Sequence, residues 1–407
     1  MASTVPASGV ADTQRTTKKN TLVAACTAHA AHDGLSDLVY VFLPVWQDMF
    51  ALSYVWLSVL RSAYALTLAT LQIPAATLSA KVRPAHLLVI STLVTALGWF
   101  LAGLAGSALA LGGALVIAGI GASVQHPIAS AMVARAYGSA AKRPLGLYNF
   151  AGDIGKSVLP AVAAALLTYG TYHSVVMVCA GVGLLAALLI WTLVRNVVTP
   201  DPSKVAKAAK APVHDSAKSK ALGRGFQALL STAVLDSAVR MGFLTFLPFI
   251  IKAQGGSLAQ TGFALTLVFI GGAVGKFCCG WFADVLGSAR TILLTELLTA
   301  ALIAVVLMAP LAWAMIALPF LGVVLNGTSS VLYGAVTDVV DSATLEKSYS
   351  VFYTGTIGAG ALAPVLYGFA GDHLGVTAAV LIIAGTAAVA FLPVTIVSLR
   401  HPGLFDQ

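Results

Sequence analysis

Long apolar runs repeat along the whole chain, and short polar segments separate them. Each run has roughly 20–28 residues, which is the length an α-helix needs to cross a bilayer. The runs are continuous and do not alternate, so the pattern of a membrane β-barrel does not fit. The sequence therefore predicts an all-α membrane protein with twelve transmembrane helices, at about 21–45, 53–79, 86–107, 109–136, 144–168, 172–196, 224–252, 257–284, 289–309, 311–340, 347–371 and 376–399.

One connecting segment is much longer than the others. Residues 197–223 are rich in Lys, Ala, Pro and Ser, which is typical of a flexible linker. This segment divides the predicted helices into two groups of six, an N-terminal bundle at 21–196 and a C-terminal bundle at 224–400. The polar ends, 1–20 and 401–407, are predicted to be tails.

Composition supports the membrane assignment. Of the 407 residues, 58% are hydrophobic and only 9% are charged, whereas a soluble protein carries about a quarter charged residues. The net charge of +8 comes from the loops, so it does not indicate nucleic-acid binding. The first apolar run is long enough to span and follows a polar start, so no cleavable signal peptide is predicted. All four cysteines fall in apolar runs and are interpreted as small apolar residues, with no metal site and no cofactor.

The positions of Lys and Arg predict the orientation. With the N-terminus inside, Lys252 is the only one of the 23 Lys and Arg residues that falls in an external loop. Four others lie within predicted spans, and the rest are cytoplasmic. Because basic residues concentrate in cytoplasmic loops, both termini are predicted to be cytoplasmic in a multi-pass protein of the cell (inner) membrane.

The first predicted helix carries an unusual polar stretch, His29-Ala-Ala-His-Asp33-Gly-Leu-Ser-Asp37. His29, Asp33 and Asp37 are four residues apart, so they share one helical face. A related pattern, from Asp236 to Pro248, opens the second half, with Arg240 in the place of Asp37. Two related halves, each beginning on a helix with buried charge, indicate a transporter.

Charged residues occur in only some of the predicted spans. A charge at the centre of a membrane helix costs roughly 2.5–3.5 kcal/mol, so it persists where it faces a wet cavity or a partner. The helical rise of about 1.5 Å per residue places Asp33, Arg61, Lys156 and Asp236 at one height near mid-membrane. We therefore expect these groups to line a central cavity, with Arg61 near Asp33.

A six-plus-six layout with a long basic central loop resembles the major facilitator superfamily. Gly280-Trp-Phe-Ala-Asp284-Val-Leu-Gly287-Ser-Ala-Arg290 is similar to the signature of that superfamily between the second and third helices of a half. The resemblance implies two pseudo-symmetric six-helix bundles with substrate bound near the midplane. It also implies gating roles for Asp284, Gly287 and Arg290.

A closer resemblance is to the fosmidomycin-resistance branch of the superfamily. The similar stretches are His29 to Asp33, Gly119-Ile-Gly-Ala-Ser-Val-Gln-His126-Pro127, and Leu145-Gly-Leu-Tyr-Asn-Phe-Ala-Gly152-Asp-Ile-Gly155 followed by Pro160. This branch is known for proton-coupled efflux, so the resemblance implies an exporter. Ile128, Asp153 and Lys156 depart from its usual pattern.

Site roles follow from these patterns. A carboxyl group in a low-dielectric cavity can exchange a proton near neutral pH, so the acids Asp33, Asp37, Asp153 and Asp236 are predicted to couple protons to transport, with Asp33 foremost. Bases and aromatic residues are predicted to bind a small organic anion or an anionic drug-like molecule. These residues are His29, Arg61, Tyr64, His126, Lys156, Arg240, Lys276 and Tyr353. Protons, the substrate and membrane lipid are the expected partners, nucleic acid is not, and a monomer is expected.

Several alternatives remain open at this point. Asp153 with Lys156, and Asp236 with Arg240, could simply neutralise each other along one helix. The protein could import a carboxylate or a zwitterion with protons. His29, His32 and His126 could bind a transition metal or its chelate for transport. Asp33 and Asp37 form the DxxxD pattern of intramembrane prenyl transferases, although Arg240 replaces an acid in the second copy.

Overall fold

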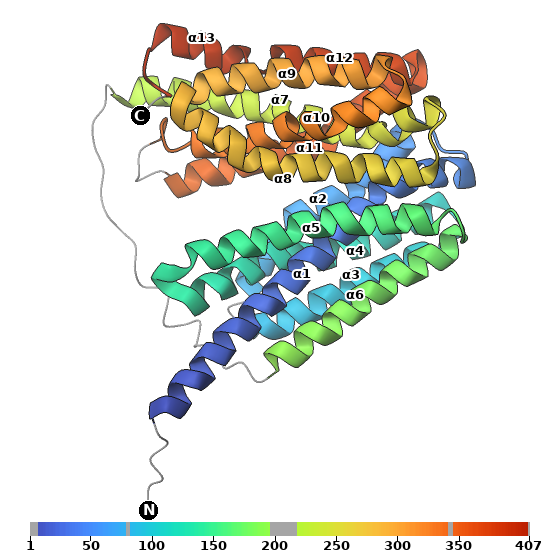
Figure 1. Cartoon of the computed structure of the whole chain (residues 1–407), viewed down its shortest axis with the longest axis vertical. Helices are drawn as coiled ribbons and strands as arrows, with labels where there is room; N and C mark the ends of the chain where they lie inside the picture. The colour runs from blue at the N-terminus through green and yellow to red at the C-terminus, as the bar shows by residue number, and fades with distance from the viewer. Residues whose placement is uncertain (1–6, 79–81, 196–217, 341–344, 406–407) are drawn as a thin grey trace, which may run out of the picture. The chain divides into compact units, whose positions relative to one another are not determined.

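Every regular element in the described part of the chain is a helix (Figure 1). The computed structural model describes residues 7–78, 82–195, 218–340 and 345–405. The helices are α1 (Ala7–Phe50), α2 (Tyr54–Leu78), α3 (Pro84–Gly103), α4 (Ala108–Tyr137), α5 (Lys142–Leu166), α6 (Tyr172–Val194), α7 (Lys218–Ala253), α8 (Leu258–Leu286), α9 (Ser288–Met308), α10 (Leu311–Gly334), α11 (Leu345–Leu374), α12 (Val376–Ala390) and α13 (Leu392–Arg400), with the 3-10 helix η1 (Gly138–Ala140). The predicted all-α class is confirmed.

Nine helices among the described residues are long and apolar enough to cross a membrane, with α12 and α13 counted as one. Helices α1, α5 and α11 fall outside this set. The polar stretch of the sequence lies on α1, and Asp153 and Lys156 lie on α5. These two helices, which carry the charges nearest to Asp33, are thus less apolar than the nine, as expected where protein surrounds a charge.

Several helix boundaries differ from the sequence prediction. Helices α1 and α7 begin at Ala7 and Lys218, so both extend before their predicted spans. The last predicted span breaks at Phe391, because Pro393 sits in the first turn of α13 and has no N–H to continue α12. Residues 197–217 of the predicted linker lie outside the described residues. The bounds predicted for the tails and the two bundles stay predictions.

Helix ends follow local capping chemistry, and α8 shows it clearly. The Ser257 side chain accepts a hydrogen bond from the Gln260 amide, and the Gln260 side chain accepts one from the Ser257 amide. This reciprocal capping box satisfies two amides that a helix N-terminus leaves free. At the other end, Gly287 has a φ of +85°, which favours glycine, and it separates α8 from α9.

The helices gather into two compact units. Unit 1 comprises Met1–Leu38, Thr67–Leu159 and Gly170–Ala208, and unit 2 comprises Val39–Leu66, Pro160–Tyr169 and Ala209–Gln407. The core of unit 1 contains Leu88, Val133 and Ile190, and that of unit 2 contains Phe352 and Phe405. Each unit therefore has its own buried apolar centre.

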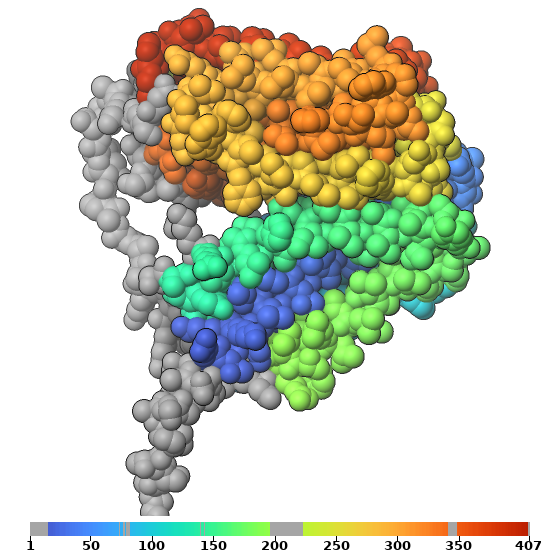
Figure 2. All heavy atoms as spheres, in the orientation of Figure 1, coloured from blue at the N-terminus to red at the C-terminus, as the bar shows by residue number. Residues whose placement is uncertain are grey.

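Small residues allow the helices of unit 2 to approach closely, and α8 against α10 is the clearest pair. A Cβ added at Gly271 would lie 2.0 Å from the Pro319 carbonyl oxygen, and one at Gly322 would lie 2.2 Å from that of Val268. Such contacts leave room only for hydrogen, so glycine is required on both helices. Figure 2 shows the side chains of α8, α9 and α10 forming a continuous surface.

A polar seam joins α2 to α11, also within unit 2. Ser62 donates a hydrogen bond to the Ala361 carbonyl, and Arg61 donates one to the Gly360 carbonyl. At the first turn of α2, the Asp372 carboxylate accepts hydrogen bonds from the Tyr54 amide at 2.7 Å and the Val55 amide at 3.0 Å. An acid from α11 therefore caps the N-terminus of α2, where it also complements the helix dipole.

Candidate functional site

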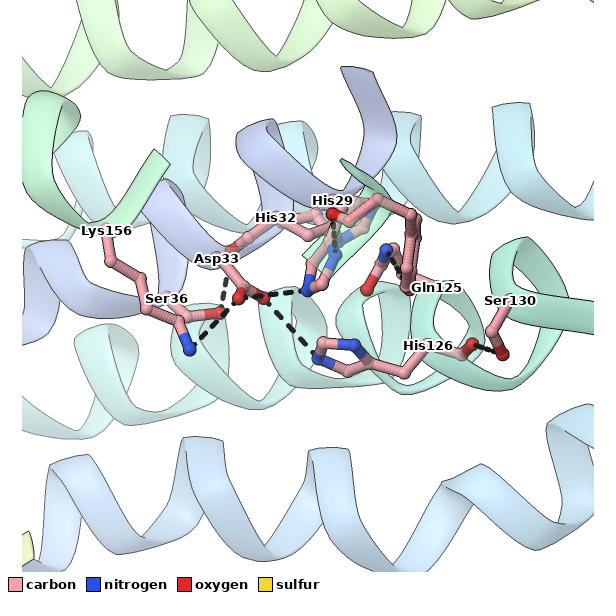
Figure 3. Close-up of polar contacts among 10 residues, drawn as sticks. His29, His32, Asp33, Ser36, Gln125, His126, Ser130 and Lys156 are labelled. Carbon is pink, nitrogen blue, oxygen red and sulfur yellow. Dashed lines mark hydrogen bonds and ion pairs between the residues drawn. The ribbon is translucent and has the colours of Figure 1, made fainter. Parts of the chain in front are cut away.

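The centre of the candidate site is the Asp33 carboxylate on α1, in unit 1 (Figure 3). His29 precedes it by one helical turn and shares its face, and both residues are buried. The Nε2 atom of His29 lies 3.1 Å from Oδ2 of Asp33. A pair of ionisable groups is thus held inside the helices with little contact with solvent.

The other ring nitrogen of His29 fixes where protons must lie. Its Nδ1 atom is 2.8 Å from the Tyr148 carbonyl oxygen, and a carbonyl only accepts, so Nδ1 carries a hydrogen. A neutral imidazole has a single N–H, so Nε2 would then present a lone pair to the Asp33 carboxylate. The contact between His29 and Asp33 is attractive only when a further proton lies on Nε2 or on the carboxyl group.

Two more groups contact the Asp33 carboxylate from α5 and α4. Lys156 Nζ lies 3.1 Å from Oδ2, and His126 Nε2 lies 3.4 Å from Oδ1. Figure 3 shows Lys156 approaching from one side and both imidazoles from the other. The Lys156 and His126 side chains are 33% and 40% exposed, against 6% for Asp33, so a solute can reach the bases while the acid stays buried.

Glycines on α1 and α5 make this geometry possible. A Cβ at Gly152 would lie 2.6 Å from Nε2 of His29, and one at Gly155 would lie 2.0 Å from the Ala30 carbonyl oxygen. On the α1 side, a Cβ at Gly34 would lie 2.8 Å from the Gly155 carbonyl oxygen. The two backbones therefore cross at van der Waals contact, which brings Lys156 within reach of Asp33.

Tyr148 and Gln125 support the site from behind. The Tyr148 ring stacks on the His29 ring with centroids 4.1 Å apart, and Gln125 donates a hydrogen bond of 3.0 Å to the Tyr148 hydroxyl. Sequence reasoning did not assign Gln125 a role. Its place directly before His126 in the Gln-His-Pro stretch was the available signal.

His32 points away from the acid, so it does not join His29 in the alternative metal site (Figure 3). Its Nε2 lies 3.0 Å from the Thr92 hydroxyl, which donates to the Leu88 carbonyl, and its Nδ1 lies 3.4 Å from the Thr95 hydroxyl. His32 is therefore held by α3 as a buried structural residue.

The residues that could hold a metal ion are instead His29, Asp33 and His126, whose ligand atoms all lie within 4.8 Å of one another. The Lys156 ammonium contacts the same Asp33 carboxylate and would repel a divalent cation there. A proton shared between His29 and Asp33 explains the contact between these two side chains without a metal ion.

Arg61 lies in unit 2, where it is 7% exposed. It donates hydrogen bonds to the Gly360 carbonyl and to the Tyr40 hydroxyl, the latter at 3.2 Å. Both acceptors are neutral. Arg61 therefore has no carboxylate partner among the described residues, whereas the cationic partner of Asp33 is Lys156. Because Arg61 and Asp33 belong to different units, the expected pairing of the two stays a prediction.

The acids and bases of α7 form a second polar group in unit 2. Asp236 is buried, and Arg240, one turn later, interacts with it electrostatically. Glu296 of α9 is buried as well, and its Oε1 atom has no hydrogen-bond partner among the described residues. Glu296 was not predicted as a site residue.

The remaining predicted residues are distributed over both units. Asp37 and Asp153 are half-buried and act electrostatically on Lys156. Tyr64 is buried, whereas Lys276 and Tyr353 are exposed. The Tyr353 ring packs on Tyr333, with centroids 4.9 Å apart.

The predicted gating residues lie where α8 meets α9. Gly287 forms the turn between the two helices, and the side chains of Asp284 and Arg290 on either side of it are exposed. Asp284, Ser288 and Asp338 line an open pocket at this turn.

Solved structures with the same fold come from transporters. A bacterial homolog of the human lysosomal transporter Spinster, in an inward-facing and occupied conformation, has a TM-score of 0.72 and 16% identity and covers 93% of this chain and 94% of its own. The peptide transporter POT in complex with sulfate has a TM-score of 0.78 and 13% identity, with 95% and 96% covered. At these identities the likeness shows the fold alone.

The family model described as Major Facilitator Superfamily matches residues 25–235 and again residues 229–404. No curated protein matches the chain. The double match agrees with the repeat seen in the sequence, and a transporter family with transporter neighbours makes the alternative of a prenyl transferase wrong. The chain is a multi-pass membrane protein that belongs to the major facilitator superfamily, and it is a transporter rather than an enzyme.

Proposed function

We propose that this protein is a proton-coupled secondary transporter that works by alternating access and exports a small organic anion or an anionic drug-like molecule. Export comes from the resemblance to the fosmidomycin-resistance branch. Proton coupling and the anionic character of the substrate come from the arrangement of charges described above.

The observation that carries the proposal is the contact between His29 and Asp33. Because His29 Nδ1 donates to the Tyr148 carbonyl, the 3.1 Å contact between Nε2 and Oδ2 needs a further proton. That proton lies beside the Lys156 ammonium, which shares Oδ2. Removing or adding one proton changes how strongly Asp33 holds Lys156, which is the link that coupling requires.

Two bases supply the anion site. Lys156 is held by Asp33 and becomes available when the acid is neutralised, and its side chain is one-third exposed. Arg61 is buried with only neutral acceptors, so its charge has no partner of opposite sign in the described chain. Its planar group can donate two parallel hydrogen bonds to a carboxylate or a phosphonate.

One contact favours a second candidate, proton-driven uptake of a carboxylate or a zwitterion. Protonating Asp33 releases Lys156, so the proton and an anion on Lys156 bind together rather than in competition. Positive coupling between two ligands is the thermodynamic basis of symport, whereas an exporter driven by inward protons needs negative coupling. The sign of this coupling therefore distinguishes the two directions.

A binding screen tests the proposal without knowledge of the natural substrate. Purified full-length protein is heated with a panel of carboxylates, phosphonates, anionic drugs and divalent metals at two pH values. We expect an anion to raise the melting temperature of the wild type and of Arg135→Ala, a control with an exposed side chain. The same anion should not stabilise Arg61→Ala. Stabilisation by metals alone, or equal stabilisation of Arg61→Ala, would contradict an anion site at Arg61.

The stabilising anion then reports the direction. When it is added to weakly buffered protein, a rise in pH means that a proton binds with it, and a fall means that a proton leaves. Uptake of protons favours the importer, and release favours the exporter. Transport by preloaded cells, measured as loss or accumulation of the same anion, checks the result independently.

The remaining expectations belong to the same proposal. The protein lies in the cell (inner) membrane with both termini in the cytoplasm, works as a monomer among lipids, and uses Asp284, Gly287 and Arg290 in gating. Cysteines introduced in the two predicted tails, at Ser3 and His401, should react with a membrane-impermeant reagent in inverted vesicles and not in intact cells.

A further inference from the structure

One surface of unit 1 is formed by α3 and α6, which lie side by side and run in opposite directions (Figure 1). Leu87, near the start of α3, shares a buried cluster with Ile190 and Val194, near the end of α6. At the other end of the pair, the Tyr172 hydroxyl donates a hydrogen bond of 3.1 Å to the Ala102 carbonyl. Both helices are long and apolar enough to cross a membrane, so the start of α3 and the end of α6 reach the same membrane surface.

An exposed stripe on α6 changes from apolar to basic along the helix. Four residues at successive steps of four, three and four positions share one face, and their side chains are exposed: Leu184, Leu188, Trp191 and Arg195. The guanidinium carbon of Arg195 lies 5.5 Å from the centroid of the Trp191 ring. Tryptophan is enriched where the hydrocarbon meets the headgroups. The stripe therefore leads from leucines at the depth of the acyl chains to a cation at the level of the headgroups.

A matching stripe runs along α3. Exposed side chains at steps of four, three, four and three positions share one face of this helix, directly after its exposed N-cap residue Arg83: His86, Ile90, Leu93, Leu97 and Phe100. The basic members come first, at the end of the pair that also carries Arg195. The loop after α3 and the first turn of α6, at the opposite end, contain no Lys or Arg. Both stripes are thus basic at one common end and apolar along the remainder, and Figure 2 shows α6 at the surface of unit 1.

The positive charge at this end has no compensating acid on the neighbouring helices. Helices α3, α4 and α6 contain no Asp or Glu. Among the described side chains of α1 and α5, the acids of unit 1 are Asp33, Asp37 and Asp153, and none of them is exposed. The cation of a zwitterionic headgroup would therefore find no exposed carboxylate among these side chains. An anionic headgroup brings only the charge that two guanidinium groups bind well.

We infer that Arg83 and Arg195 bind the headgroup of an anionic phospholipid, whose acyl chains lie along the exposed faces of α3 and α6. The two arginines match the phosphate, Trp191 matches the interface, and the apolar stripes match the chains. A water-soluble anion would use the arginines and leave the stripes without a role. Binding at this surface depends neither on the transported substrate nor on the direction of transport, so it can be tested separately from the proposed function.

Quenching of Trp191 by lipids with brominated acyl chains tests the inference. Purified full-length protein in detergent micelles is titrated with dibrominated phosphatidylglycerol or with dibrominated phosphatidylcholine, and comparison with Trp191→Phe isolates the signal of Trp191. We expect half-maximal quenching at a lower concentration of the anionic lipid, by roughly fivefold for each of the two arginines. Equal quenching of Trp191 by the two lipids would overturn the inference, whether or not any arginine variant folds.

Arginine variants locate the site. The double variant Arg83→Gln/Arg195→Gln should lose the preference for the anionic lipid, whereas Arg135→Gln, at an exposed arginine near the end of α4 and outside both stripes, should keep it. Equal loss in Arg135→Gln would indicate a diffuse effect of surface charge and contradict a site on α3 and α6. Glycerophosphate and a polyglutamate peptide serve as competing anions without acyl chains. Displacement of the brominated lipid by an equal concentration of either anion would place a water-soluble ligand at the arginines and contradict a lipid site.

Discussion

The Lys156 ammonium on α5 lies 3.1 Å from Oδ2 of Asp33 on α1. This ion pair therefore joins two helices rather than two turns of one helix. A pair that joins helices can respond when the helices move, whereas a pair within one helix moves as a unit.

Asp33→Asn should abolish proton-driven transport and leave exchange of substrate intact. The substitution removes the carboxyl group and the ion pair of 3.1 Å that it forms with Lys156. Removing one member of a buried ion pair costs about 3–5 kcal/mol, so the melting temperature should also fall. Transport of the anion found by the thermal screen, measured in proteoliposomes with and without a proton gradient, checks both parts of the prediction.

Asp48→Asn is the matched control for this acid. Asp48 pairs with Lys252 at 2.9 Å, but both side chains are at least half exposed. Exposed pairs contribute about 0–1 kcal/mol, so stability and transport should hardly change. Uphill transport that survives in Asp33→Asn at the level of Asp48→Asn would reject the role of Asp33.

Gly152→Ala should disturb the site, whereas Gly146→Ala on the same helix should not. The new methyl group at position 152 would meet the His29 ring at 2.6 Å, and at position 146 it would meet nothing within 4 Å. Overpacking costs typically 1–3 kcal/mol, whereas alanine in open helix surface gains up to about 1 kcal/mol over glycine. Melting temperatures in detergent should therefore move in opposite directions, and equal shifts would argue against the contact.

His29→Gln and His32→Gln should separate proton exchange from packing. His29 touches the Asp33 carboxylate, so its substitution should reduce the protons exchanged when the anion binds. His32 contacts Thr92 and Thr95, so its substitution should lower stability by about 1–3 kcal/mol and leave proton exchange unchanged. Titration of weakly buffered protein measures the protons, and a loss of exchange in both variants would contradict this division.

Tyr40→Phe should leave the affinity for the anion unchanged, whereas Arg61→Lys should lower it. The Tyr40 hydroxyl accepts a hydrogen bond from Arg61, so its loss should cost roughly 0.5–1.5 kcal/mol of stability without changing charge. Lysine keeps the charge but lacks the planar fork, so the affinity for a carboxylate or phosphonate should fall about tenfold, or roughly 1.4 kcal/mol. Calorimetry with the stabilising anion compares the two variants, and equal affinities would place the anion away from Arg61.

The helices were predictable because twenty-residue apolar runs have a strong physical cause. The break at Pro393 and the helical starts at Ala7 and Lys218 were missed, since hydropathy reports the width of the bilayer and not the full length of a helix that leaves it. The spacing of His29 and Asp33 correctly placed both side chains on one face of α1.

Partners between helices were harder to predict. Helical spacing could not show that His32 turns to α3 or that Lys156 reaches α1, because both depend on how closely the backbones cross. The glycines at 34, 152 and 155 permit that crossing, but the sequence does not state which helix faces them.

The first turn of α2 is capped by Asp372, a residue 318 positions later in the chain. Any rearrangement that moves α2 away from α11 breaks the two hydrogen bonds to Asp372. Water must then replace the protein partners of two amide donors and one carboxylate. The Asp372 side chain is exposed even in the capped form, so dissolved ions weaken the attraction between its charge and the end of α2. The equilibrium between conformations with and without the contact of α2 and α11 should therefore depend on the ionic strength of the solution. The salt concentration must be kept constant when conformations of different samples are compared.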